Sequence, residues 1–151
     1  MVNSFSRLMA SLLAIGMPAP AFAADFTTAE SAIRSLEEAY IKKDIEAAVA
    51  AKDFTEEARL MLQGLDAEFP NDPEMVRMTA EVLELSFRND IKASGFPNFS
   101  ELKCSLGETD NVTPTLVKVT ERCIFPDGGT SIQHLQVFNG AQGWRVIGVL
   151  D

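Results

Sequence analysis

The side chains most able to do chemistry lie in the second half of the chain. His134 is the single histidine, and histidine is the side chain that titrates near neutral pH, so it is the first candidate for a general base or a proton relay. Glu121 and Gln136 are its expected neighbours on one face of a sheet. The alternative is a half-exposed strand histidine without a chemical role, because placement on that face depends on strand register.

Three further residues bear on the same site. Glu121 stands between Val119 and Cys123. Burying its carboxylate there costs free energy unless that face of the sheet is exposed to water or the acid has a hydrogen-bonding partner. Tyr40 ends an apolar stripe and could offer its hydroxyl to a ligand, although such a tyrosine more often packs its ring and bonds to the backbone. The predicted ligand-binding set is Tyr40, Glu121, Phe125, His134 and Gln136.

Several kinds of site are not expected. One histidine and two cysteines form no cluster with metal-ligand spacing, so no metal is predicted. The sequence has no glycine-rich phosphate loop, nucleophile elbow or HExxH motif, and no cofactor is predicted. A formal net charge of -9 without a lysine and arginine stripe argues against a nucleic-acid partner.

The N-terminus predicts export. Residues 1–7 carry one positive charge, residues 8–17 are apolar, and Ala21-Phe22-Ala23 has small residues where a signal peptidase cuts. We therefore predict a signal peptide over residues 1–23, cleaved after Ala23, and a periplasmic or secreted protein. Residues 24–151 form one predicted domain, which contains no further segment long and apolar enough to span a membrane.

The two cysteines fit that location. Cys104 and Cys123 are an even pair, and an exported chain encounters an oxidising compartment. We predict a disulfide between them, although the strand register expected below does not clearly bring the two residues together.

The first half of the mature chain reads as helices. Thr27-Thr28-Ala29-Glu30 has the spacing of a capping box, which opens the first helix. Asp44 and Asp53 are predicted caps of the second and third helices. Asp72, followed by Pro73, begins a long fourth helix that should end at Gly95.

The second half reads as strands. Alternation of apolar and polar residues predicts strands over 99–106, 115–125, 130–139 and 144–150, with a polar loop over 107–114. Helices followed by strands predict an α+β fold in which N-terminal helices pack on a curved antiparallel β-meander. A two-residue turn at Gly128-Gly129 would place Cys123 opposite His134 and Glu121 opposite Gln136, and a three-residue turn would move His134 to the other face.

Two segments carry a resemblance to a known family. Ala32–Tyr40 followed by Lys43–Ala48 resembles an opening helix that ends in an aromatic residue before an aspartate caps a short helix. Gly143–Val149 is similar to a closing strand that contains a tryptophan. The chain thus resembles the nuclear transport factor 2-like superfamily, which includes ketosteroid isomerases and SnoaL-type polyketide cyclases. The resemblance implies a cone-shaped fold with a cavity for small apolar molecules.

The match to that family is architectural rather than chemical. Residues 54–96 hold more helix than compact members have, and the strand usually found between the early helices is not obvious. The isomerases use an aspartate base, yet Asp44 and Asp53 are explained as caps and no aspartate lies within a predicted strand. No catalytic residue carries over.

Three functions follow as hypotheses. The favoured one is a non-enzymatic domain that binds a small apolar or amphipathic molecule in the cone. The second is an isomerase-like or cyclase-like enzyme using His134 and Glu121. The third is an interaction module, in which the outer face of the sheet pairs two copies as a homodimer and the cavity is vestigial.

Overall fold

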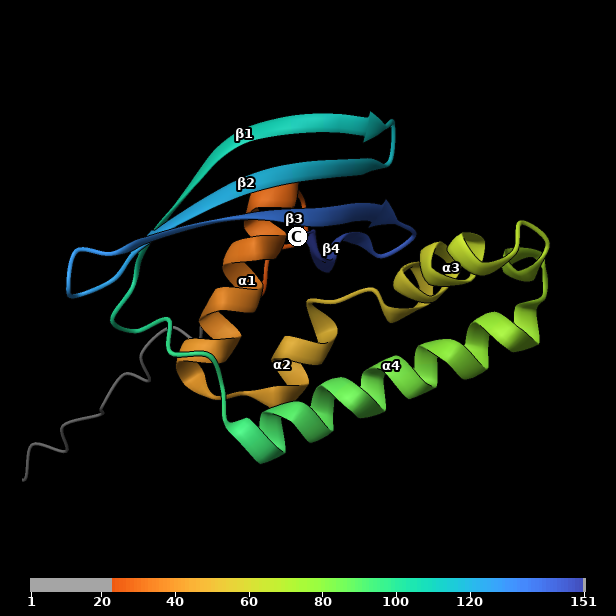
Figure 1. Cartoon of the computed structure of the whole chain (residues 1–151), viewed down its shortest axis with the longest axis horizontal. Coiled ribbons are helices and arrows are strands. Elements are labelled where there is room, and N and C mark those ends of the chain that lie inside the picture. The colour runs from red at the N-terminus through yellow and green to blue at the C-terminus, as the bar shows by residue number, and fades with distance from the viewer. Residues whose placement is uncertain (1–22, 151) are drawn as a thin grey trace, which may run out of the picture.

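The computed structural model describes residues 23–150, so residues 1–22 of the predicted signal peptide lie outside the described part. Four helices, with one 3-10 turn, precede four strands (Figure 1). The elements are α1 Ala29–Lys42, α2 Ile45–Ala50, α3 Phe54–Leu65, η1 Phe69–Asn71, α4 Pro73–Ser94, β1 Lys103–Thr113, β2 Leu116–Ile124, β3 Thr130–Gly140 and β4 Gly143–Leu150. The α+β class predicted from the sequence is confirmed.

Three of the four helix starts lie where the aspartates predict them. The side chains of Asp44, Asp53 and Asp72 accept hydrogen bonds from backbone N–H groups in the first turns of α2, α3 and α4. These N–H groups have no partner within a helix, so a carboxylate at this position stabilises the helix start. Gly95, with φ of 82°, ends α4 as expected.

The cap of α1 differs from the prediction by one residue. Thr28, rather than Thr27, is the N-cap, and its hydroxyl accepts from Ser31 N at 3.0 Å. Ser31 Oγ completes the capping box in place of Glu30 by accepting from Thr28 N. Thr27 instead donates to the carboxylate of Asp25 and lies before the N-cap of α1.

The four strands form one antiparallel sheet in the order β1-β2-β3-β4, which is the predicted meander. The first strand is misplaced in the prediction, because β1 covers most of the expected 107–114 loop and does not include 99–102. β1 is an edge strand whose polar side chains face solvent, so apolar alternation does not mark it. An ion pair between Asp110 and Lys118, 3.2 Å apart, ties it to β2.

The predicted register of β2 on β3 is wrong by three residues. Thr120 lies opposite His134 and Glu121 lies opposite Gln133. The connection is not a two-residue turn at Gly128-Gly129 but a loop over 125–129, closed by a hydrogen bond from Phe125 N to Gly129 O. A shift by an odd number of residues exchanges the two faces of one strand relative to the other.

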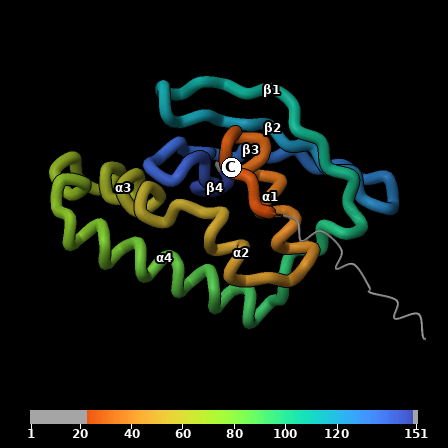
Figure 2. The backbone as a smooth tube through the Cα atoms, turned by 180° about the vertical axis from the view of Figure 1, so that it is seen from behind, coloured from red at the N-terminus to blue at the C-terminus, as the bar shows by residue number. Residues whose placement is uncertain are grey.

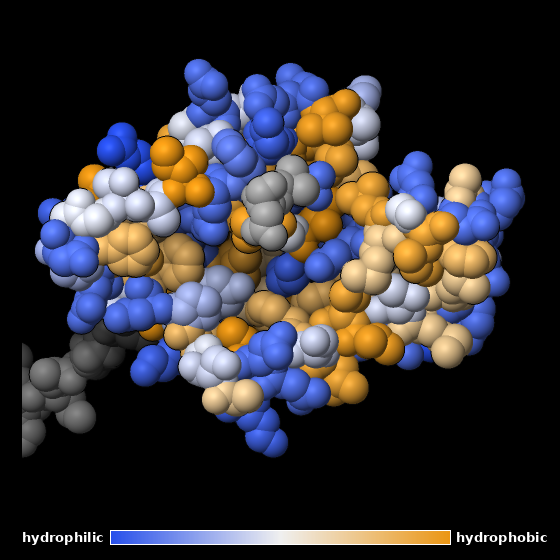
Figure 3. Space-filling model, viewed as in Figure 1, coloured by the Kyte–Doolittle hydropathy of each residue, from blue (hydrophilic) through white to orange (hydrophobic). Residues whose placement is uncertain are grey.

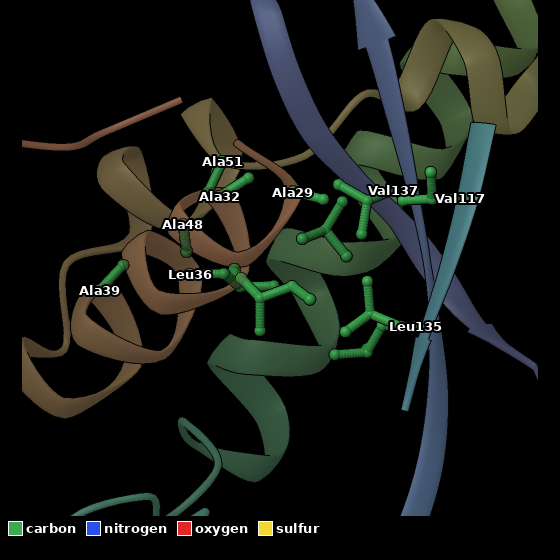
Figure 4. Packing of buried hydrophobic residues seen from close by; sticks show 12 residues of the cluster. Ala29, Ala32, Leu36, Ala39, Ala48, Ala51, Val117, Leu135 and Val137 are labelled. Atoms are coloured by element: carbon green, nitrogen blue, oxygen red, sulfur yellow. The ribbon is translucent and has the colours of Figure 1, made fainter. Parts of the chain in front are cut away.

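All helices lie on one side of the sheet (Figures 1 and 2). α1 crosses the inner face and contacts β2, β3 and β4, whereas α4 lies farther out against α2 and α3. Alanines on α1 and α2 let the helices approach closely; Figure 4 shows Ala32 and Ala48 among the helices and Ala29 beside Val137 of the sheet. Among the helices of the described chain, none is both long and apolar enough to cross a bilayer.

The segment between α2 and α3 and the N-terminal segment both pack near β4. Lys52 forms an isolated parallel bridge to Val146, supported by a hydrogen bond from Asp53 N to Val146 O at 3.0 Å. Phe26 O accepts from Trp144 N, and a Cβ on Gly143 would lie 2.6 Å from that oxygen. A glycine is therefore required at this turn, which also has φ of 88°.

The packing of α1 on the sheet predicts a large difference between two isoleucines. Ile33 on α1 is 1% exposed, whereas Ile132 on β3 is 64% exposed. Ile33→Ala should lower the free energy of unfolding by about 2–5 kcal/mol, because it leaves a cavity beneath the sheet. Ile132→Ala should change it by about 0.5 kcal/mol or less. Urea unfolding under non-reducing conditions measures both, and equal losses would contradict this placement of α1.

Candidate functional site

The most unusual polar feature of the structure is a pair of carboxyl groups between α1 and the sheet. Glu121 on β2 is 1% exposed, and Glu37 on α1 is also buried. Arg34 Nη1 donates to Glu37 Oε2 at 2.7 Å, and Gln133 Nε2 donates to Glu121 Oε2. Each carboxyl keeps one buried oxygen, Oε1, to which no donor is found.

The surroundings of Glu121 favour its protonated form. Burial raises the pKa of Glu121 to about 7, and the neighbouring Glu37 carboxyl acts in the same direction. The amide of Gln133 and the charge of Arg34 lower the pKa, but less strongly. Two carboxylates cannot donate to each other, so a proton on one of them supplies the donor that the pair lacks. The buried site therefore favours the protonated form of Glu121 near neutral pH.

A disulfide lies beside this pair. Cys104 and Cys123 face each other directly on β1 and β2 and are bonded. Cys123 Sγ is 3.6 Å from Glu121 Oε2. The two sulfurs and the Glu121 carboxyl are close enough together to ligate one metal ion, but disulfide sulfurs are not thiolates, so the oxidised cluster is not a metal centre.

The structure separates two residues that the sequence placed with Glu121. His134 Nδ1 shares a hydrogen bond of 3.1 Å with Thr120 Oγ1, and Gln136 lies opposite Lys118. Because successive strand residues point to opposite faces, His134 and Gln136 lie on the outer face while Glu121 lies on the inner face. His134 and Glu121 do not form an acid–base pair.

The two remaining predicted ligand residues also lie apart. Tyr40 stacks on Phe99 with ring centroids 5.7 Å apart, and it is tilted against Phe96 at 6.2 Å. Burial raises the pKa of Tyr40 to about 12, which keeps its hydroxyl neutral. Phe125 is exposed in the β2–β3 loop. These two residues do not join the carboxyl pair in one pocket.

A cleft of about 790 Å³ lies elsewhere, between α4, the start of α3 and the β3–β4 turn. Its apolar lining includes Phe54, Val76, Ala80 and Phe138. None of the five predicted ligand residues lines it. Apolar surface also gathers on the α3–α4 side of the molecule in Figure 3.

Charged groups of both signs line the same cleft. Arg59, Arg77 and Arg145 are the arginines, and Asp53 and Glu81 are among the acids. Arg145 stacks on Phe26, with its guanidinium carbon 3.5 Å from the ring centroid. Its Nε and Nη1 donate to backbone carbonyls, whereas Nη2 has no hydrogen-bond partner among residues 23–150 and can donate to a ligand.

The sequence did not reveal two residues of the site around the Glu121–Glu37 carboxyl pair. Glu37 stands four residues after Ile33 in the apolar stripe of α1, and an acid at that position signals a buried polar partner. Gln133 was missed because the predicted register paired Glu121 with Gln136 instead. The cleft residues are far apart in sequence and carry no shared motif.

Comparison of the chain with known protein families, curated proteins and solved structures finds no match. The chemistry of the two sites therefore rests on their residues alone.

The carboxyl pair predicts a specific pH dependence of stability. Glu121 has an ordinary pKa of 4.5 and a folded-state pKa of about 7, so the folded chain binds more protons between these values. Its contribution to stability is complete below pH 4.5 and is lost as pH rises through 7, by about 3 kcal/mol at most. Glu121→Gln should remove this loss, as measured by urea unfolding from pH 4 to 8.

The matched control is Glu108→Gln, which replaces an exposed acid on β1. Its stability should follow the wild-type pH profile. A Glu121→Gln profile parallel to wild type would show that Glu121 titrates alike in the folded and unfolded chains.

Proposed function

We propose that this chain is an exported, nuclear transport factor 2-like domain that binds a small amphipathic molecule in the cleft between α3, α4 and the β3–β4 turn. The cleft carries the proposal, because its volume of about 790 Å³ suits a small organic ligand. Export is supported by the apolar N-terminal stretch and by the Cys104–Cys123 disulfide.

The lining suggests the chemical character of the ligand. Phe54, Val76 and Phe138 offer apolar contact area for a hydrocarbon body. Arg145 offers Nη2 as a donor, and its carbonyl hydrogen bonds and the Phe26 ring fix its orientation. A guanidinium held in this way suits a carboxylate or another oxygen acceptor at the end of an apolar chain.

Features of the fold support the family resemblance. Asp44 caps α2 directly after the helix that ends near Tyr40, and four antiparallel strands close the chain. Lys52 pairs with β4 between α2 and α3, at the place where the family has an additional strand. The inner face of the sheet is filled by α1, so we place the ligand in the outer cleft rather than within a cone.

The two other hypotheses have less support. The isomerase-like enzyme required His134 and Glu121 in one cavity, and they lie on opposite faces of the sheet. A homodimer through the outer face would bring together surfaces that carry Arg122 and Lys118, of which Lys118 is already paired with Asp110. Like charges facing each other disfavour such pairing.

The cleft proposal is tested with three amphiphiles of equal chain length, decanoate, decyltrimethylammonium and decyl maltoside, each below its micelle concentration. Decanoate at ten times its dissociation constant should raise the melting temperature by about 4 °C, whereas the cationic probe should not. Thr55→Trp places a bulky ring at the cleft lining and should abolish the shift. Ala93→Trp, on an exposed part of α4 outside the cleft, should retain it.

Two outcomes would overturn the proposal. The first is the absence of a shift with all three amphiphiles. The second is an equal decanoate shift in wild type and in Thr55→Trp, which would place binding outside this cleft.

A further inference from the structure

The disulfide lies at an edge of the sheet, with its two sulfurs in different surroundings. β1 is the outermost strand, and Cys104 on it is half-buried. Cys123, on the neighbouring strand, is 3% exposed. An incoming thiol therefore reaches the Cys104 sulfur more readily than the Cys123 sulfur, and the sulfur attacked determines which one leaves.

The leaving sulfur would be produced next to an acid. Cys123 Sγ lies 3.6 Å from Glu121 Oε2, whose carboxyl is buried and retains an oxygen without a donor. A disulfide sulfur carries no proton, so this contact contributes little while the bridge is closed. A thiolate released here would be costly, because burial away from water disfavours its charge.

We propose that Cys104, Cys123 and Glu121 form a dithiol–disulfide exchange site in which Glu121 gives a proton to Cys123 when the bridge opens and takes it back when the bridge closes. This site is separate from the proposed ligand cleft, since none of its three residues lines that cleft. The reaction partner is a dithiol, either small or part of a protein, that approaches the β1 edge.

The exchange balances in two steps. A thiolate of the partner forms a bond to Cys104 Sγ, the Cys104–Cys123 bond breaks, and the electron pair on Cys123 Sγ takes the proton of the Glu121 carboxyl. The second thiol of the partner, as a thiolate, then displaces Cys104, which takes a proton from water. The partner loses two electrons and two protons as it becomes a disulfide. The chain gains both electrons and, through Cys104, one proton from water; the other proton stays in water, because Cys123 was protonated by Glu121, which is left as a carboxylate.

The role of Glu37 follows from the same geometry. Its carboxyl adjoins Glu121 and favours the protonated form of that acid, and Arg34 holds Glu37 in place at 2.7 Å. Gln133 fixes Glu121 Oε2 from the neighbouring strand. Glu37 and Gln133 are positioning residues, whereas Glu121 is the residue that touches a reacting sulfur.

The test measures the rate at which dithiothreitol reduces the folded chain, by thiol alkylation and mass spectrometry between pH 5.5 and 8.5. Rates are divided by the concentration of dithiothreitol thiolate. The wild-type constant should fall as pH rises through about 7, because ionised Glu121 has no proton to give. Glu121→Gln should be at least about tenfold slower at pH 6 and show no such inflection.

Two further variants keep the test decisive. Glu108→Gln, an exposed acid on the same strand as Cys104, should reproduce the wild-type profile. Glu37→Gln retains the Glu121 proton donor but removes the adjacent charge, so its inflection should move to lower pH. This variant reports on Glu121 even if Glu121→Gln does not fold.

Two results would overturn the proposal. One is an equal thiolate-specific rate and pH profile in wild type, Glu121→Gln and Glu37→Gln. The other is a rate that does not increase with dithiothreitol concentration, which would show that the bridge is reduced only after the chain unfolds.

Discussion

The register of β2 against β3 determines which side chains of the sheet meet α1. With Glu121 opposite Gln133, the inner face presents Val117, Val119 and Glu121 to the helix, and the outer face presents Thr120 beside His134. A shift of one residue would exchange these sets and bury polar side chains beneath α1. The apolar contacts of α1 therefore hold in place the same register that buries an acid.

The burial of Glu121 is stable only because its neighbours compensate for it. Gln133 donates to one oxygen, and protonation of Glu121 avoids placing two negative charges together. Arg34 balances the remaining charge from the solvent side of α1. The same network places the Glu121 carboxyl beside the disulfide. The packing of α1 on the sheet therefore also puts a proton donor next to Cys123.

α1 also determines where a ligand has room. Its small residues let it fill the inner face of the sheet, and the open volume lies instead beside α4 and the β3–β4 turn. The molecule thus has two separate features with chemical potential: a mixed apolar and charged cleft, and a buried cluster of an acid pair and a disulfide.

Local signals in the sequence were sufficient for much of the fold. Asp44, Asp53 and Asp72 mark helix starts because each satisfies free backbone N–H groups within three residues, which requires no tertiary information. β1 escaped prediction because an edge strand with polar residues resembles a loop. The register escaped because Gly128-Gly129 suggests a tight turn, whereas the backbone closes from Phe125 to Gly129.

The site of Glu121 and the disulfide was predictable only in part, because it too depends on strand register. The sequence identified Glu121, Cys104 and Cys123 as residues of interest, and the disulfide between the two cysteines is present. Their arrangement with Glu37 and Gln133 depends on long-range pairing that no local pattern specifies. The cleft is formed by segments distant in sequence and had no signal of its own.

The chemistry proposed for this site depends on Glu121 being buried beside Glu37, which raises the pKa of Glu121 well above its ordinary value. The most direct measurement is a carbon-13 NMR titration of the two side-chain carboxyl groups in the folded, oxidised protein. A Glu121 midpoint near pH 7 is the predicted result. A Glu121 midpoint near its ordinary 4.5, independent of Glu37, would contradict it.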